Sequence, residues 1–252
     1  MPDSISKAND MGRVVTIIQA RMGSQRLPGK VLATVGGTPI LGLIIKRIST
    51  ARLSGEIVVA TTQRHEDDAI EQLSTQFGVT CFRGADEDCL DRYYQAAKSF
   101  QAETVVRLTA DNPLIDDSLL DWALEEFFAA KPRCDYLDTS SSNTFPLGLS
   151  VEVFSFSALE ISWHDTLDPA LREHVTPYIR QHGERFELKH LSCPQDYSHL
   201  RWTVDTADDL KFVRALYDHF GHDHFSWREA LEGVARHPEW AEWNRHVQQR
   251  LV

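Results

Sequence analysis

Apolar and polar residues alternate along the first half of the chain in a pattern of strands separated by helices. Four short apolar runs, rich in β-branched residues, predict buried strands at 14–20, 56–62, 79–82 and 104–108. Apolar residues at helical spacing predict helices at 39–48, 67–77, 89–100 and 117–130. This alternation is typical of βαβ units and a mainly parallel α/β sheet. Ligands bind beyond the carboxyl ends of such strands, so we expect the loops after Ala20, Thr62, Phe82 and Leu108 to share one crevice.

The pattern changes after about residue 133, which predicts a small α+β insertion at about 133–199. Within it we expect strands at 134–139, 149–154 and 186–191 and a helix at 171–181. Residues 200–204 are predicted to return to the sheet, followed by helices at 206–220 and from Ser226 onward. We therefore expect a single domain at 13–252 after a disordered tail at 1–12. Apolar residues of the insertion predict a face that the main sheet leaves open, and hence a homodimer contact: Leu149, Val151, Val153 and Phe154.

The composition excludes some classes of binding partner. The 252 residues are 42% hydrophobic and carry a formal net charge of −11. A general nucleic-acid binder needs the opposite sign, so a phosphate ligand should meet a local basic cluster. We expect no membrane insertion, since no apolar run is long enough, and no signal peptide, since residues 1–12 lack an apolar core. The four cysteines have no zinc spacing and predict reduced thiols in a cytoplasmic protein.

The segment 21–30, RMGSQRLPGK, carries the strongest chemical signal. It follows a buried strand and combines cations, glycines and a hydroxyl: Arg21, Arg26, Lys30, Gly23, Gly29 and Ser24. Fixed cations and closely approaching backbone N–H groups are what a triphosphate requires. The spacing is not that of a Walker A loop, because Val31 stands where Ser or Thr should follow the lysine. The alternative is a solvated basic loop.

Two carboxylates are predicted at strand ends that face this loop. Asp111 follows the strand at 104–108, and Asp205 follows the segment 200–204. Mg²⁺ prefers one or two carboxylates completed by phosphate oxygens, so the pair predicts a magnesium site. The alternatives are an Asx turn at Asp111 and a helix cap at Asp205.

Further polar residues have two interpretations. Arg83 and the adjacent Gly84 follow a short strand, where Arg83 is a candidate contact of the nucleotide or the phosphates; Arg92, in the next helix, is equally a surface partner of Asp88. In the insertion, Glu152, Arg172 and His174 lie beside apolar segments and are candidates for sugar binding. The alternative is a polar surface on a dimer-forming lobe.

Taken together, several stretches resemble the cytidylyltransferase family that activates acidic sugars. The family includes acylneuraminate and 3-deoxy-manno-octulosonate cytidylyltransferases and a branch labelled spore-coat polysaccharide biosynthesis protein F. The resemblance is carried by IIQARMGSQRLPGKVL, VVATTQRHEDDAI, CFRGADEDCLDRYYQAA, VVRLTADNPLID, SVEVFS, REHVTPYI and RWTVDTADDL. It implies a Rossmann-like sheet of the nucleotide-diphospho-sugar transferase type.

The resemblance also implies roles for particular residues. A triphosphate loop is implied by Arg21, Ser24, Arg26 and Lys30, and magnesium ligands by Asp111 and Asp205. The base is expected near two segments, represented by Ala60, Thr61, Thr62, Arg83 and Gly84. Well-characterised members have a longer sugar-acid pocket, so the acceptor stays open.

The expected reaction is attack of a sugar oxygen on the α-phosphorus of CTP, with pyrophosphate as the leaving group. Mg²⁺ and the loop cations Arg21 and Lys30 would stabilise the developing charge. One alternative is a glycosyltransferase that uses a nucleotide sugar, for which Asp86-Glu87-Asp88 is a D-x-D candidate. Another is a nucleotide-binding regulator without catalysis.

Overall fold

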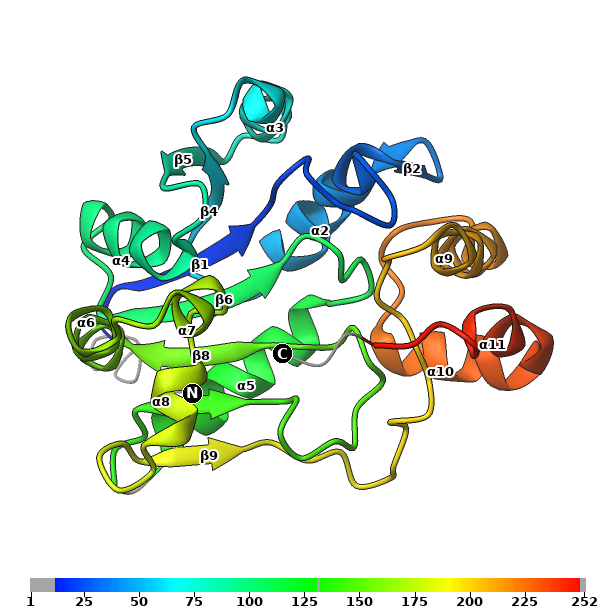
Figure 1. Ribbon diagram of the computed structural model, residues 1–252. Helices are drawn as coiled ribbons and strands as arrows, with labels where there is room; N and C mark the ends of the chain where they lie inside the picture. The colour runs from blue at the N-terminus through cyan, green and yellow to red at the C-terminus, as the bar shows by residue number, and fades with distance from the viewer. Residues whose placement is uncertain (1–11, 131, 250–252) are drawn as a thin grey trace, which may run out of the picture.

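The protein is built around one twisted β-sheet, seen in a computed structural model that describes residues 12–130 and 132–249 (Figure 1). Seven strands lie in the order β5-β4-β1-β6-β8-β7-β9. Their bounds are β1 Val14–Gln19, β4 Glu56–Thr62, β5 Thr80–Gly84, β6 Thr104–Thr109, β7 Tyr136–Asp138, β8 Glu152–Ser155 and β9 Leu188–His190. A separate small hairpin pairs β2 (Thr34–Val35) with β3 (Thr38–Pro39). The mostly parallel α/β class predicted from the sequence is confirmed.

The strand register brings the carboxyl ends of the central strands to one edge. Gln19, the last residue of β1, pairs with Ala60 of β4 on one side and with Thr109 of β6 on the other. Thr62, at the end of β4, pairs with Gly84 at the end of β5. Among the described strands of this sheet, β8 alone runs antiparallel to its neighbours. The segments that follow β1, β4, β5 and β6 therefore leave the sheet side by side.

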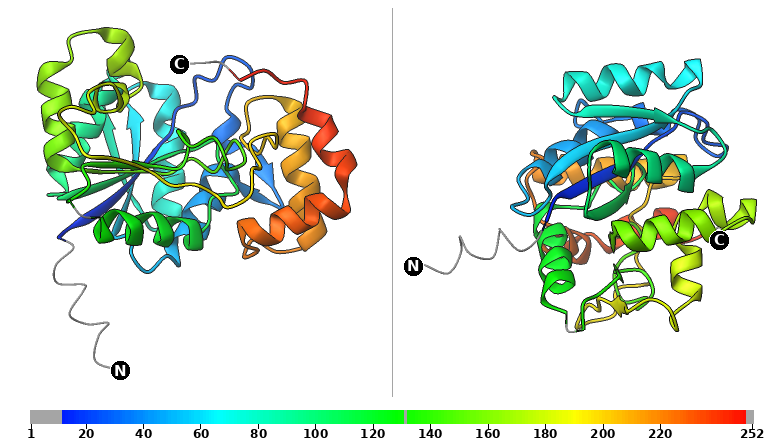
Figure 2. Two further views of the ribbon diagram at one scale, coloured as in Figure 1. Left: turned by 90° about the horizontal axis from the view of Figure 1, so that it is seen from below. Right: turned by 90° about the vertical axis from the view of Figure 1, so that its left-hand side faces the viewer.

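Helices cover both faces of the sheet (Figure 2). Their bounds are α2 Ile40–Ser49, α3 Asp68–Gln76, α4 Cys89–Ser99, α5 Asp117–Ala129, α6 Phe156–Asp165, α7 Pro169–Glu173, α8 Pro177–Gln181, α9 Ala207–Phe220, α10 Trp227–Arg236 and α11 Pro238–Asn244. Short 3₁₀ turns span η1 Lys30–Leu32 and η2 His65–Asp67. Successive residues of a strand face opposite sides, so Val15 and Ile17 pack into one core and Val14 and Ile18 into the other. Among the described residues, no helix has the length and apolar character that a membrane span requires.

Helix starts follow local sequence signals. Asp88 precedes α4, and its carboxylate accepts the N–H of Asp91 at 2.8 Å. Thr206 and Asp209 form a reciprocal capping box at the start of α9. Each arrangement satisfies N–H groups that the first turn of a helix leaves without an internal partner. Both helix starts thus lie at fixed positions next to the strand-end edge.

The region 133–199 differs from its prediction in how it packs. Strands β7, β8 and β9 extend the main sheet beyond β6 instead of forming a separate face. The four apolar residues on which the dimer prediction rests are buried within the single chain: Leu149, Val151, Val153 and Phe154. The homodimer remains a prediction, but without this argument for it.

Two further element predictions need correction. The helix expected at 171–181 is broken between α7 and α8, where Val175 has a left-handed φ of +68°. Pro177 then begins α8 in its first turn, where the missing N–H of proline costs nothing, so the break lies at Val175 and the next helix starts immediately after Thr176. The segment 200–204 forms no strand of the sheet. Its strand-like pairing is limited to an isolated β-bridge between Arg201 and Leu147. The tail predicted at 1–12 lies outside the described residues except for Gly12.

Candidate active site

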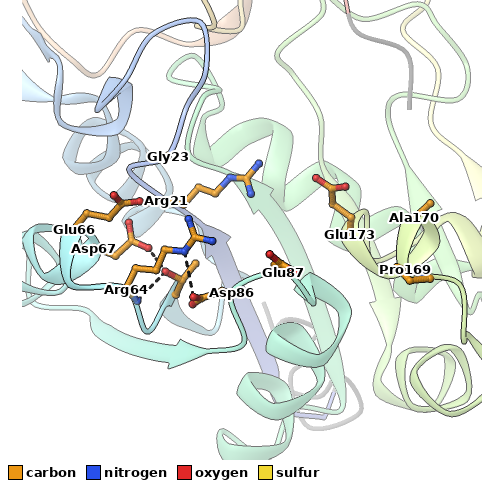
Figure 3. Close-up of a pocket in the computed structure, with 11 residues that line it drawn as sticks. Arg21, Gly23, Arg64, Glu66, Asp67, Asp86, Glu87, Pro169, Ala170 and Glu173 are labelled. Atoms are coloured by element: carbon orange, nitrogen blue, oxygen red, sulfur yellow. Dashed lines mark hydrogen bonds and ion pairs between the residues drawn. The ribbon is translucent and has the colours of Figure 1, made fainter.

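Two adjoining cavities lie at the strand-end edge. The first, here called the β4–β5 cavity, has a volume of about 410 Å³ and is shown in Figure 3. It is lined by Arg21, Gly23, Thr62, Arg64, Glu66, Asp67, Asp86, Glu87, Pro169, Ala170 and Glu173. The second, here the loop cavity, has about 480 Å³ and is lined by Gln19, Ala20, Arg21, Gly23, Ser24, Gln25, Arg26, Lys30, Val31, Thr109, Ala110, Asp111, Glu173 and Asp205. Arg21, Gly23 and Glu173 line both, so the cavities form one crevice.

The basic loop between β1 and η1 is folded back on itself. The N–H groups of Ser24 and Gly29 both donate to the carbonyl of Met22, at 2.8 and 3.1 Å. Gly29 has a φ of +68°, a conformation that glycine adopts without steric cost. This turn directs the following residue, Lys30, back toward the strand ends.

A buried carboxylate fixes the start of this loop. Asp67 is 1% exposed, accepts the N–H of Met22 at 2.7 Å, and also accepts the hydroxyl of Thr62. The segment after β4 thus holds the segment after β1. Asp67 was not among the predicted site residues, although its position shortly after a strand end could have indicated it.

Lys30 joins the two predicted metal ligands. Its Nζ donates to Oδ2 of Asp111 at 2.9 Å and to Oδ1 of Asp205 at 2.8 Å. The hydroxyl of Thr109 donates to the other oxygen of Asp111, at 2.6 Å. Arg26 approaches Oδ2 of Asp205 at 2.8 Å. The structure therefore brings the predicted basic loop and the predicted carboxylates, far apart in sequence, to one point.

These contacts set the charge states. Burial alone would lower the pKa of Lys30, but the negative charge of Asp111 and hydrogen bonds to Asp205 and Asp111 raise it overall. Burial alone would raise the pKa of Asp205, but the hydrogen bond and charge of Lys30, with Arg26, lower it overall. Both shifts favour the charged forms of Lys30 and Asp205.

The carboxylate pair has the right chemistry for a magnesium ion. The described residues contain no cluster of three or more His, Cys, Asp and Glu side chains that could enclose a metal. Mg²⁺ does not need such a cage, because it takes one or two carboxylates and completes its shell with water and phosphate oxygens. Asp111 and Asp205 supply hard oxygen ligands, and the ammonium of Lys30 already shows that one cation can contact both. The residues present fit the ion.

The two segments predicted to bind the nucleotide base face the crevice only in part. Ala60 and Thr61 are fully buried in β4, and of that segment Thr62 lines the β4–β5 cavity. Arg83 lies in a different depression, against α3, where its Nη1 contacts Asp68 at 2.5 Å and Glu71 at 3.1 Å.

Gly84 is buried between other side chains. A Cβ placed there would come within 2.9 Å of the Phe82 ring and 3.0 Å of the Arg92 side chain. Its small size permits the close packing of β5 against α4.

Several cavity residues were missed in the sequence. Figure 3 shows Arg21 and Arg64 directed into the β4–β5 cavity, with Glu173 facing them from the α7 side. Arg64 Nε contacts Asp86 at 3.2 Å, and Glu87 lies beside Asp86. Arg64 follows a strand end, a signal that could have found it, whereas Glu173 had no such signal. Asp86 and Glu87 are predicted only as part of a D-x-D candidate and not as residues of a nucleotide site.

The predicted sugar-binding residues are engaged inside the protein. Glu152 is 6% exposed; one of its carboxylate oxygens pairs with Arg107, and the other accepts the hydroxyls of Tyr136 and Thr176, both at 2.6 Å. Burial alone would raise the pKa of Glu152, but the charge of Arg107 and these hydrogen bonds lower it overall. Neither cavity is lined by Glu152.

Arg172 and His174 flank the cavity-lining Glu173. Arg172 Nε contacts Asp88 at 2.6 Å, and its Nη1 donates to two backbone carbonyls. His174 lines a neighbouring cavity of about 370 Å³ together with Arg180, and burial lowers its pKa. Arg172 therefore anchors α7. Glu173, which lies between Arg172 and His174, is directed toward the crevice.

The turn between α7 and α8 is strained and held in place. Val175 is fully buried in a left-handed conformation that a β-branched residue rarely adopts. Thr176, next along the chain, is tied to Glu152 and so to the sheet. The buried pair of Arg107 and Glu152 thus fixes the turn that presents Glu173 to both cavities.

Known proteins match this chain over most of its length. The sequence pattern of the family described as cytidylyltransferase matches residues 15–219. An uncharacterized protein of Methanocaldococcus jannaschii is 37% identical over 94% of this chain and 97% of its own. The spore coat polysaccharide biosynthesis protein SpsF of Bacillus subtilis is 34% identical over 84% of this chain and 89% of its own.

Solved structures agree with these matches. A cytidylyltransferase from Leptospira borgpetersenii superposes with a TM-score of 0.89 at 33% identity, covering 96% of this chain and 100% of that one. A CMP:2-keto-3-deoxy-manno-octonic acid synthetase complexed with CTP shares the fold, with a TM-score of 0.63 at 18% identity over 82% of this chain and 99% of that one. From its sequence, its fold and this family match, the chain belongs to the cytidylyltransferase family.

Proposed function

We propose that this protein transfers CMP from CTP to a sugar, with an acidic sugar as the acceptor, and releases pyrophosphate in a Mg²⁺-dependent reaction. The observation that carries the proposal is the contact of Lys30 with both Asp111 and Asp205 inside the loop cavity. A triphosphate entering this cavity meets Arg21, Arg26 and Lys30, cations that an acidic protein otherwise has no reason to gather in one crevice.

Lys30 has two alternative sets of anionic partners in this proposal. Without nucleotide it bridges the two carboxylates; with CTP bound it turns to the phosphates. Asp111 and Asp205 would then be available to hold Mg²⁺, and the ion would supply neutralisation of phosphate charge. Arg21 and Lys30 stabilise the charge that develops as the sugar oxygen bonds to the α-phosphorus and the bond to pyrophosphate breaks. The sugar hydroxyl loses its proton to solvent.

The base occupies the β4–β5 cavity, because the loop cavity takes the phosphates and the two adjoin at Arg21. This cavity offers both kinds of partner that cytosine needs. The carboxylates of Asp86 and Glu87 accept from the exocyclic amino group, and the guanidinium of Arg64 donates to the carbonyl oxygen and the unprotonated ring nitrogen. Uracil has a carbonyl where cytosine has the amino group, so these carboxylates disfavour it.

The acceptor class rests on the relatives. One is named for spore coat polysaccharide biosynthesis, and others are 3-deoxy-manno-octulosonate cytidylyltransferases, 27% identical over 81% of this chain in one case. We therefore place the reaction in the activation of a sugar for surface polysaccharide. Glu173 and the α7–α8 turn form the wall on the acceptor side.

The test is a screen of the four nucleoside triphosphates against sugar acids, neutral sugars and sugar phosphates. Mass spectrometry detects the nucleotide sugar, and a coupled assay measures pyrophosphate. We expect equal amounts of CMP-sugar and pyrophosphate with CTP, lost in chelator and in the Lys30→Met protein. Consumption of a nucleotide sugar as donor, without pyrophosphate, would instead establish a glycosyltransferase.

A further inference from the structure

The C-terminal segment makes direct contacts with the candidate active site. Residues beyond 219, including α10 and α11, lie outside the matched family pattern. At the end of α11, the Asn244 side chain is 1% exposed and donates to the Arg201 carbonyl at 2.9 Å and to Asp209 at 3.0 Å. Farther on, the Gln249 side chain accepts from Arg201 at 2.8 Å, and the Gln248 carbonyl accepts from Arg26 at 3.2 Å. Residues 244–249 therefore meet both arginines that contact Asp205.

Arg201 is a buried link between this segment and Asp205. It is 8% exposed, and its Nη2 donates to Oδ2 of Asp205 at 2.9 Å. Its Nε and Nη2 also donate to the two oxygens of Asp209, at 2.8 and 3.2 Å. Asp209 in turn accepts the N–H groups of Asp205 and Thr206, at 3.0 and 2.9 Å. Both the backbone and the carboxylate of Asp205 are thus fixed from behind.

The three cations on Asp205 are not equivalent. Lys30 and Arg26 belong to the basic loop and line the loop cavity, so a bound triphosphate competes for them. Arg201 does not line that cavity, and its charge is matched by Asp209. It remains in place when the loop cations turn to the phosphates, and it keeps one oxygen of Asp205 fixed.

We propose that Arg201 is a positioning residue for Asp205, and that the C-terminal segment, through Asn244, holds Arg201 and Asp209 in the geometry this requires. The inference rests on the proposed function, since it assigns Asp205 to the metal–triphosphate site. It gives the residues beyond the family pattern a role in the reaction. Groups that orient a metal ligand from behind commonly change metal affinity by roughly 10- to 100-fold when they are removed.

The experiment measures Mn²⁺ affinity in the presence of CTP, by the electron paramagnetic resonance signal of free Mn²⁺. Asn244→Ala removes both amide contacts, and Arg201→Lys keeps the charge but loses the fork that spans Asp205 and Asp209. We expect Mn²⁺ binding to weaken roughly tenfold in each. CTP affinity in chelator, measured by calorimetry, should change less than twofold because Arg21, Arg26 and Lys30 are intact.

A matched control separates positioning from loss of stability. Thr16→Val removes a buried hydrogen bond of 2.6 Å to the Ser54 carbonyl, away from both cavities. It should lower the melting temperature without changing Mn²⁺ affinity. If Asn244→Ala does not fold, the test uses Arg201→Lys together with Gln249→Ala, a change at an exposed residue. Gln249→Ala should weaken Mn²⁺ binding as well, but by less than the roughly tenfold expected for Arg201→Lys.

The outcomes distinguish this inference from the proposed function. Tight Mn²⁺ binding in the wild-type complex, unchanged in the Asn244→Ala and Arg201→Lys proteins, would overturn the positioning role alone. Wild-type protein that binds no Mn²⁺ with CTP would overturn the proposed function and this inference together.

Discussion

Two sets of ion pairs flank the crevice, and they differ in what they face. On the loop side, Lys30 pairs with Asp111 and Asp205, and all three line a cavity. On the α7–α8 side, Arg107 pairs with Glu152, and neither lines the two cavities of the crevice. The first set can exchange its partners for a ligand, whereas the second is closed within the protein. Similar chemistry therefore serves binding in one place and architecture in the other.

The difference is visible in how each carboxylate is satisfied. Glu152 takes its partners from the sheet and the α7–α8 turn: Arg107, Tyr136 and Thr176. Asp205 takes two of its three cations from a loop that a triphosphate can attract. A charged residue near a crevice can thus bind a ligand when its present partners are replaceable.

The largest expected effect is on stability, from Glu152→Ala. It leaves Arg107 buried without its counter-ion, and breaking a buried pair in this way costs about 3–5 kcal/mol. Urea unfolding measures the change. The control Glu232→Ala breaks an exposed pair with Arg236 and should cost less than about 1 kcal/mol. A similarly small loss for Glu152→Ala would show that the two sides of the crevice do not differ as described.

Lys30→Met should act on turnover instead. Loss of a cation that stabilises the transition state costs about 3 kcal/mol, roughly a hundredfold in kcat. The unfolding free energy should change much less, because Asp205 retains Arg26 and Arg201. Steady-state pyrophosphate release measures the rate, and Lys46→Met, which removes an exposed cation paired with Asp223, is the control. A rate near that of the wild type would exclude Lys30 from the reaction.

A smaller effect should separate two arginines of neighbouring segments. Arg64→Ala removes a side chain that lines the β4–β5 cavity, and we expect the KM for CTP to rise about tenfold, or about 1.4 kcal/mol. Arg83→Ala breaks contacts with Asp68 and Glu71 and hydrogen bonds to the carbonyls of Thr62 and Arg64, but removes no side chain from the cavity, so it should raise this KM less than Arg64→Ala does. The reverse ranking would place the base on the side of α3.

The smallest effect concerns pH. The pKa of Asp205 is lowered in the folded protein, chiefly by Lys30, against the opposing effect of burial. A depressed folded-state pKa contributes stability above the unfolded pKa, near 4, and that contribution disappears as pH falls through the folded value. The difference in unfolding free energy between wild type and Asp205→Asn should therefore be greatest at neutral pH and shrink in acid. A difference that stays constant from pH 7 to pH 3 would argue against this pairing.

Much of this arrangement could be predicted from the sequence, for physical reasons. Buried parallel strands are continuous apolar runs, so the edge where β1, β4 and β6 end could be located, along with the loop at Lys30 and the carboxylate Asp111. The family was likewise identified from sequence motifs, several of which lie at this edge.

The rest depends on contacts between distant residues. Nothing local in the sequence shows that Glu152 would be neutralised by Arg107, or that Val175 would break a helix and turn Glu173 toward the crevice. The outward position of Arg83 and the inward position of Arg64 depend likewise on how α3 packs beside β5. Periodicity identifies elements, whereas partners are chosen by the tertiary fold.

The central claim is that CTP binds in this crevice with its triphosphate at Lys30. Calorimetric titration of the wild-type and Lys30→Met proteins with each nucleoside triphosphate in the presence of Mg²⁺ tests it most directly. We predict that CTP binds wild type most tightly, that UTP binds more weakly, and that Lys30→Met loses at least tenfold in CTP affinity. Equal CTP affinity in the two proteins, or tighter binding of another nucleotide, would contradict the account.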